Sequence, residues 1–164
     1  MRLAGQKAGP DGSRVRASSV LVAVTGESCD AAVVRLACQL LNSNKGKVHI
    51  LFVIEVERAF PVDAEVTLAT AKGEKVLKAM EEVAKASKCV SEGELVQARQ
   101  VGSAVVQEAF DRNVETIVLG LTYNQSYGSF TMGDVVPYVL KNAPCRVIVW
   151  RDPVNEAITN GHPA

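Results

Sequence analysis

Short, almost uninterrupted apolar runs recur along the chain and alternate with longer stretches that are apolar on one side only. Short continuous runs of β-branched and aliphatic residues are typical of strands buried on both faces of a sheet. The third run is more polar than the others, so we expect it near an edge of the sheet. The five runs cover residues 20–24, 48–54, 95–99, 116–120 and 145–150.

The stretches between these runs predict four helices. In the first, apolar positions fall on one helix face, with Ser28 as the N-cap and the helix ending at Lys45 and Gly46. The second covers residues 64–88, and Gly73 inside it predicts a break or kink, because glycine costs about 1 kcal/mol relative to alanine there. The face of the first helix is formed by Val33, Val34, Ala37, Leu40 and Leu41.

The third helix opens at Gly102 and Ser103, and the fourth follows a polar loop that covers residues 121–132. Residues 142–144 stop the fourth helix. The predicted apolar faces are Val105, Val106, Ala109 and Phe110 in the third helix, and Val135, Val136, Val139 and Leu140 in the fourth. Alternating strands and helices predict an α/β domain: a five-stranded parallel sheet with helices on both faces. We expect this domain at residues 19–152, between a flexible N-terminal tail (1–18) and a C-terminal tail (153–164).

Composition narrows the function classes. Eighteen basic residues balance eighteen acidic ones, so we expect no general nucleic-acid binding, which needs a basic excess. No apolar run is long enough to cross a bilayer and no secretory h-region is present, which predicts a cytoplasmic protein without a membrane partner. The four cysteines form no CxxC pair and no zinc pattern, so we expect reduced thiols and no metal.

Chemistry in such a sheet is expected at the carboxyl ends of the strands, near the point where the strand order reverses. This points to Thr25 and Gly26 after the first strand and to residues 120–133 after the fourth. A glycine-containing loop that enters a helix can bind phosphate through free N–H groups, although such loops are common. No nucleophile lies beside a base, and His49 and His162 are far apart in the sequence, so we do not predict an enzyme.

The loop after the fourth strand resembles the phosphate loop of ATP-binding universal stress proteins, in which Gly, two residues, Gly, nine residues and Gly precede Ser or Thr. Gly120 and Gly133 keep its overall spacing. The flanking residues 102–106, 115–120 and 142–149 are similar too, so the likeness covers residues 20–151. The resemblance implies the adenine-nucleotide α-hydrolase-like fold with strand order 3-2-1-4-5. It also places Val53 at a position that lies against adenine.

Three positions depart from that family pattern. Tyr123 replaces the second glycine, and Asp134 replaces the Ser or Thr that meets phosphate. Thr25 stands where ATP-binding members often have an acidic residue. We expect Asp134 to cap the free N–H groups of the fourth helix and to repel phosphate. The candidate pocket comprises Thr25, Gly26, Val53, Gly120, Thr122, Ser129, Thr131, Gly133 and Asp134.

The leading hypothesis is therefore a non-enzymatic universal stress protein without a tightly bound cofactor, acting through protein contacts. Val147, Ile148, Val149 and Trp150 form an apolar edge strand, through which the resemblance implies a homodimer. The alternative is that the C-terminal tail covers this edge. Two other functions remain open: a switch gated by ATP or AMP, in which loop hydroxyls including Ser126 bind the ligand, or a regulatory domain of a transporter or kinase.

Overall fold

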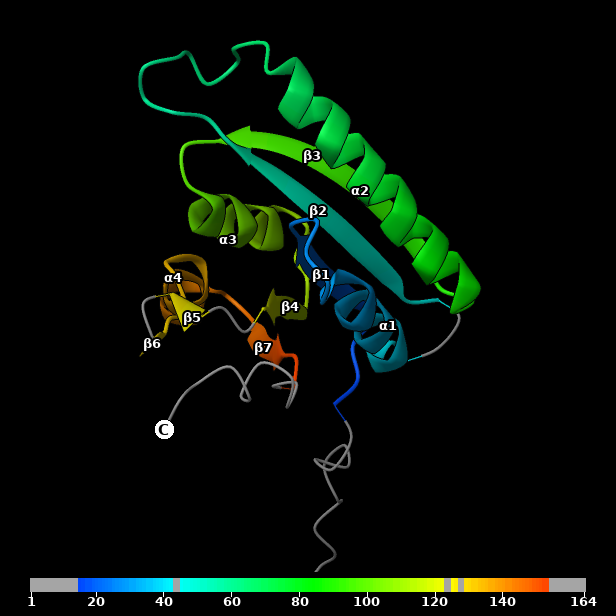
Figure 1. The fold of residues 1–164 in the computed structure, drawn as a ribbon. Helices are drawn as coiled ribbons and strands as arrows, with labels where there is room; N and C mark the ends of the chain where they lie inside the picture. Colours follow the sequence, from blue (N-terminus) through cyan, green and yellow to red (C-terminus); the bar gives the residue numbers. More distant parts are fainter. Residues whose placement is uncertain (1–14, 43–44, 123–124, 127–128, 154–164) are drawn as a thin grey trace, which may run out of the picture.

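The main sheet contains five parallel strands in the order β3-β2-β1-β4-β7 (Figure 1). The computed structural model describes residues 15–42, 45–122, 125–126 and 129–153. The strand order confirms the predicted 3-2-1-4-5 arrangement and the edge position of the third strand. The strands are β1 (Ser19–Val24), β2 (Lys47–Glu55), β3 (Val90–Ala98), β4 (Thr116–Leu121) and β7 (Arg146–Arg151).

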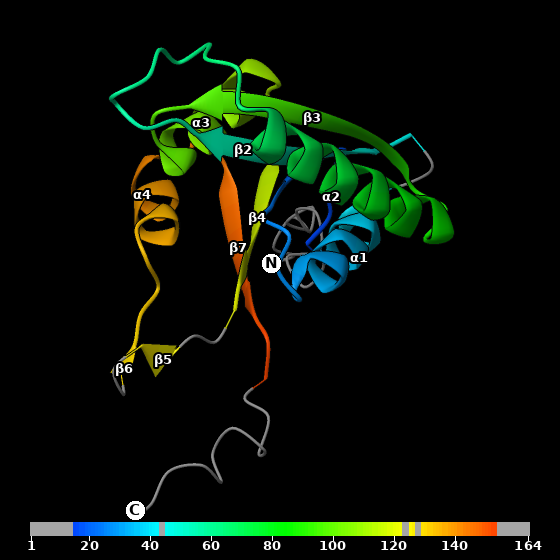
Figure 2. The same cartoon turned by 45° about the horizontal axis from the view of Figure 1, so that its top comes forward.

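Helices cover both faces of this sheet, as the alternating pattern predicts. α1 (Asp30–Leu40) and α2 (Thr67–Ala86) lie on one face, and α3 (Val101–Asp111) and α4 (Val135–Asn142) lie on the other (Figures 1 and 2). Side chains of β1 alternate between the two cores: Val22 packs under α1 and α2, whereas Leu21 packs under α3 and α4. None of the helices within the described ranges has the length and apolar character that crossing a membrane requires.

The start and end of α1 differ from the prediction. Its five predicted core residues are buried, but the N-cap is Cys29 rather than Ser28, and the helix ends at Leu40 rather than at Lys45 and Gly46. The backbone explains the early end. Ala17 N–H donates to the Leu40 carbonyl at 2.8 Å, and Asn42 N–H donates to the Ala17 carbonyl at 2.9 Å. These bonds join the end of the helix to the segment before β1.

Gly73 does not break α2. The helix runs through it from Thr67 to Ala86, and Gly73 is buried. A Cβ atom at this position would lie 2.5 Å from Leu95 Cδ1 and 2.8 Å from Phe52 Cδ1. The missing side chain therefore lets α2 approach β2 and β3 closely, and this packing outweighs the low helix propensity of glycine.

The structure differs from the sequence prediction in two further places, in α3 and α4 and in the loop after β4. Phe110 and Leu140 were predicted on core faces but are 69% and 54% exposed. Each lies at the end of an otherwise correct apolar stripe, where the helix surface turns towards solvent. The loop after β4 contains a short antiparallel pair, β5 (Gln125–Ser126) with β6 (Ser129–Phe130), which alternating hydrophobicity does not reveal. Figures 1 and 2 show this pair apart from the main sheet.

Candidate functional site

A cavity of about 430 Å³ opens at the carboxyl ends of β1, β2 and β4, and it is lined by the start of α4 on one face of the sheet and by Lys72 of α2 on the other. It therefore lies where the strand order reverses, as an open parallel sheet predicts. The structure brings together residues from the β1–α1 loop, β2 and the β4–α4 loop. The sequence-predicted residues that line it are Thr25, Val53, Gly120, Thr122, Gly133 and Asp134.

The remaining predicted residues lie beside the cavity or in the β4–α4 loop. Gly26 follows Thr25 in the β1–α1 loop and lies against Lys72 and Val76 of α2. Thr131 is exposed, and its Oγ1 accepts a hydrogen bond from Gly133 N–H at 3.2 Å. Ser129 belongs to β6, and Tyr123 lies outside the described residues. The cavity wall is thus made largely of strand ends and the start of α4.

One end of the cavity is apolar. Ala23 of β1 is paired with Leu51 of β2 and with Leu119 of β4, so three neighbouring strands contribute to the same wall. Val53 extends it along β2, and Val136 of α4 faces it. Val53 is only half-buried, so a flat apolar group can reach it. This end can hold a planar ring by apolar contact.

The β1–α1 loop is held by a buried carboxylate that sequence reasoning missed. Asp30 is 3% exposed and accepts hydrogen bonds from Gly26 N–H at 2.7 Å and from Thr25 N–H at 3.2 Å. Burial raises the pKa of Asp30, and the N–H groups of Gly26 and Thr25 partly oppose that rise. Gly26 adopts φ +88°, which suits glycine in this tight turn. The two N–H groups are therefore already used within the protein.

The start of α4 departs from the capping prediction. Asp134 is the N-cap residue, but its side chain makes no capping hydrogen bond, and its backbone is already helical at φ −96° and ψ −28°. The expectation that Asp134 caps the free N–H groups of α4 is therefore wrong. Its carboxylate is exposed at the cavity wall instead. A Ser, Thr, Asp or Asn cap normally needs an extended backbone at this position, which Asp134 lacks.

Few N–H groups remain at this end of the cavity. Gly133 N–H bonds to Thr131, and Pro137, in the first turn of α4, has no N–H to offer. At the start of α4 itself, Asp134, Val135 and Val136 keep the N–H groups that a helix start leaves free. An incoming phosphate would meet these donors together with the Asp134 carboxylate.

Lys72 of α2 is a cavity residue that the sequence analysis did not identify. It lines the cavity together with Glu27 of the β1–α1 loop. A Cβ atom on Gly26 would lie 3.9 Å from Lys72 Nζ and 3.3 Å from Val76 Cγ2, so Lys72 crosses directly over this loop. The charged residues of the lining are thus Lys72, Glu27 and Asp134. The signal that could have found Lys72 is its distance of one helical turn from Val76, which packs on the core.

The packing around Gly120 leaves no room for a side chain. A Cβ atom there would lie 2.7 Å from Cys29 Sγ and 2.9 Å from Val33 Cγ2. Both atoms belong to residues at the start of α1. A glycine at this position is therefore required for the approach of α1 to the sheet, whether or not a ligand is bound.

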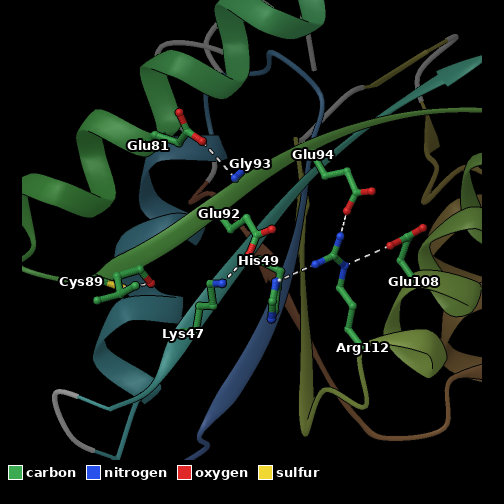
Figure 3. A network of polar contacts seen from close by, with 10 residues as sticks. Lys47, His49, Glu81, Cys89, Glu92, Gly93, Glu94, Glu108 and Arg112 are labelled. Atoms are coloured by element: carbon green, nitrogen blue, oxygen red, sulfur yellow. Dashed lines mark hydrogen bonds and ion pairs between the residues drawn. The ribbon is translucent and has the colours of Figure 1, made fainter.

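A second polar cluster lies away from the cavity, between α3 and the β2–β3 edge (Figure 3). Arg112 forms ion pairs with Glu94 and with Glu108, the latter at 3.1 Å, and donates a hydrogen bond to His49 Nδ1 at 3.2 Å. Burial and the neighbouring Arg112 charge lower the pKa of His49. This arrangement gives His49 a structural contact. Within the described ranges, no three His, Cys, Asp or Glu side chains converge to hold a metal ion.

Comparison with solved structures places this fold among universal stress proteins. A universal stress protein from Archaeoglobus fulgidus has 16% identity and a TM-score of 0.68, covering 80% of this chain and 96% of its own. Universal stress protein UspA from Lactobacillus plantarum has 23% identity and a TM-score of 0.62, covering 82% and 97%. A family protein from Arabidopsis thaliana, solved with AMP bound, has 18% identity and a TM-score of 0.61, covering 85% and 94%.

These identities support the shared fold alone, and no curated protein matches the chain. The family assignment rests on the sequence. The model of the universal stress protein family matches residues 17–151, which is most of the chain and agrees with the likeness over residues 20–151. The chain therefore belongs to the universal stress protein family.

Proposed function

We propose that this protein is a non-enzymatic, cytoplasmic regulator that acts as a homodimer through protein contacts and does not hold ATP tightly. The observation that carries the proposal is the carboxylate of Asp134 at the start of α4. It makes no capping hydrogen bond and is exposed on the cavity wall. An anion bound at a helix start gains from free N–H groups and from the helix dipole. Asp134 opposes that gain with a like charge.

The magnitudes favour exclusion of a triphosphate. Two unit charges 4 Å apart in water repel by about 1 kcal/mol, and by more where protein displaces the water. The dipole at a helix start contributes about 0.3–1 kcal/mol to binding of a negative charge at an exposed site. Asp134 alone therefore offsets what the start of α4 provides. The shortage of free N–H groups beside Gly133 and Pro137 acts in the same direction.

The nucleotide content of the purified protein tests this part of the proposal. Protein purified without added nucleotide is denatured, and the released nucleotides are separated and quantified against the protein. We expect ATP far below one molecule per chain. ATP approaching one per chain would contradict the proposal, because ligands carried through purification are tightly bound.

The homodimer is proposed through the free edge of β7. β7 pairs with β4 on one side, and no described strand lies on its other side. Val149 is 37% exposed there. The residues of β7 between its terminal Arg146 and Arg151 are all apolar, and an apolar edge strand favours pairing with another strand. The test is the sedimentation of wild type, Val149→Lys and Val90→Lys. Val90 is the matched control, since it is exposed on β3, the opposite edge. We expect a monomer only for Val149→Lys, and an unchanged mass would contradict the interface.

A nucleoside monophosphate such as AMP is the second candidate ligand. The apolar wall around Val53 suits a planar base, and Lys72, which lies over Gly26 of the β1–α1 loop, offers a cation. A relative of the same fold holds AMP. Under this alternative the protein is a switch gated by a ligand that carries less charge than ATP. A third alternative, docking on a transporter or kinase as a regulatory domain, draws on no feature of the cavity.

A further inference from the structure

Two cysteines from different elements lie together on the other side of the sheet. Cys38 belongs to the last turn of α1, and Cys89 follows the end of α2 (Figure 3 shows Cys89 where α2 passes into β3). The two helices pack against each other, and both cysteines pack on the core beneath them. All four cysteines of the chain are free thiols.

The backbone holds Cys89 firmly in this position. α2 ends in a Schellman motif, in which Cys89 N–H donates to the Ala84 carbonyl at 3.0 Å and Lys88 N–H donates to the Lys85 carbonyl at 2.9 Å. Lys88 takes the left-handed conformation that this motif needs, with φ +56°. Cys38 is held by the bonds that join the end of α1 to Ala17. Both cysteines therefore lie at helix ends whose backbone is fixed by hydrogen bonds.

Both thiols also line one surface cavity, of about 470 Å³, at the C-terminal ends of α1 and α2. Its charged lining residues are Arg16 and Lys88, and none of the described residues that line it is a carboxylate. Arg16 donates to the backbone carbonyls of Gln39 and Leu41, so these bonds leave its charge unneutralised. A small anionic reagent is attracted to such a site.

The two thiols differ in reactivity. Burial, and next the Cys89 side chain as a hydrogen-bond partner, raise the pKa of Cys38 to about 12. Cys38 therefore keeps its proton near neutral pH. Since the thiolate is the attacking form of cysteine, the first attack on a reagent falls to Cys89, and Cys38 is placed to react afterwards.

We propose that Cys38 and Cys89 form a redox-active dithiol, which small anionic disulfides convert into a disulfide between the ends of α1 and α2. Cys89 thiolate attacks one sulfur of the small disulfide; the S–S bond breaks and one half leaves as a thiolate, which takes up a proton from water, so that a mixed disulfide remains on Cys89. Cys38 then loses its proton and attacks the Cys89 sulfur, releasing the second half. Two protein thiols are oxidised, and one small disulfide is reduced to two thiols.

The test treats the reduced, full-length protein with glutathione disulfide and maps disulfide-linked peptides by mass spectrometry. Wild type and Cys145→Ser, the matched control, should yield a Cys38–Cys89 bridge. Cys38→Ser should instead accumulate the glutathione adduct on Cys89, and Cys89→Ser should form no adduct on Cys38 at neutral pH. A wild-type protein that stops at the mixed disulfide, or that links other pairs equally, would overturn the proposal.

Two further measurements separate proximity from reactivity. Phenylarsine oxide joins two close thiols with loss of water, so it should bind wild type and Cys145→Ser but neither Cys38→Ser nor Cys89→Ser. Binding that survives loss of either thiol would contradict their pairing. Cystamine, a cationic disulfide, should react more slowly than glutathione disulfide, and Lys88→Gln should narrow that difference. Equal rates for the two reagents in wild type would overturn the role of the cationic lining.

Discussion

The two ends of the cavity at the carboxyl ends of β1 and β4 differ in how they are built. The apolar end rests on adjacent strands, where Ala23, Leu51 and Leu119 are held in register by the sheet. The other end is a loop and a helix start, where Asp134 lies exposed beside Gly133. The wall that would hold a base thus belongs to the core. The surface that would hold phosphates carries an unpaired acidic side chain in place of a hydroxyl.

Under the proposed function, the fold keeps the shape of a ligand site while the charge at one end of that site differs from the family pattern. The strand ends cannot vary freely, because the same residues carry the packing of α1 and α4. Gly120 is an example, since its missing side chain makes room for Cys29 and Val33. Asp134 is exposed and is not part of the core, so we expect a charge there to change ligand preference without destabilising the fold.

The largest expected effect comes from substituting, one at a time, the two glycines whose spacing resembles the family motif, Gly120 and Gly133. Gly120→Ala should lower the free energy of unfolding by about 1–3 kcal/mol through overpacking against the start of α1. Gly133→Ala has open space around it and should cost about 1–2 kcal/mol only through its left-handed φ of +66°. Urea unfolding of both variants measures this. A Gly120→Ala variant as stable as wild type would show that Gly120 is not a packing glycine.

The next effect concerns the charge at the start of α4. Asp134→Asn removes only the charge and Asp134→Ser restores a hydroxyl, so both should strengthen ATP binding by about fivefold or more, from about 1 kcal/mol of relieved repulsion. AMP binding should change less, because AMP carries fewer phosphate charges. Calorimetric titration measures both ligands, with Glu82→Gln on the exposed face of α2 as control. Unchanged ATP binding in both Asp134 variants would contradict the repulsion argument.

A smaller effect is expected from Lys72. Lys72→Gln should weaken binding of AMP by a few-fold, consistent with about 1 kcal/mol or less for one exposed charge contact. Binding of uncharged adenosine should stay the same, since the apolar wall is untouched. Lys75→Gln is the matched control, because Lys75 is exposed on the same helix and does not line the cavity. Equal losses of AMP affinity in the two variants would show that Lys72 does not contact the ligand.

The smallest effect lies outside the cavity, at His49. Because the folded protein lowers the pKa of His49 below its ordinary value of 6.5, the unfolded chain binds the proton more readily. The free energy of unfolding therefore keeps its full value above pH 6.5 and decreases as the pH falls below 6.5, because the unfolded chain then binds a proton at His49 that the folded protein resists. Unfolding measured between pH 7.5 and pH 5 should show a smaller loss for His49→Gln than for wild type. Parallel profiles would show that His49 does not titrate in this way.

The sequence predicted the sheet well because its strands are buried on both faces, which leaves near-continuous apolar runs such as that of β4. Helix ends were less predictable, since the end of α1 at Leu40 depends on bonds to Ala17, far away in the chain. Gly73 was misjudged because helix propensity is local, whereas its reason is contact with Phe52 and Leu95.

The candidate site shows the same division. Thr25, Val53, Gly120 and Asp134 were found because they lie at strand ends or fit a known spacing. Lys72 was missed because it reaches the site from α2 through a tertiary contact. Asp30 was missed because the apolar pattern does not show that its carboxylate accepts the N–H groups of Thr25 and Gly26. The exposed state of Asp134 could not be foreseen, since an aspartate before a helix normally caps it. Only the backbone angles at that residue show that it does not.

The most direct test of the account is calorimetric titration of the nucleotide-stripped, wild-type protein with ATP in the presence of Mg²⁺ and, separately, with AMP. The account predicts that ATP binds no more tightly than AMP and does not saturate the protein at low micromolar concentration. Tight binding of ATP at one molecule per chain, exceeding that of AMP, would contradict it. That result would show that the start of α4 accepts a triphosphate despite the exposed carboxylate of Asp134.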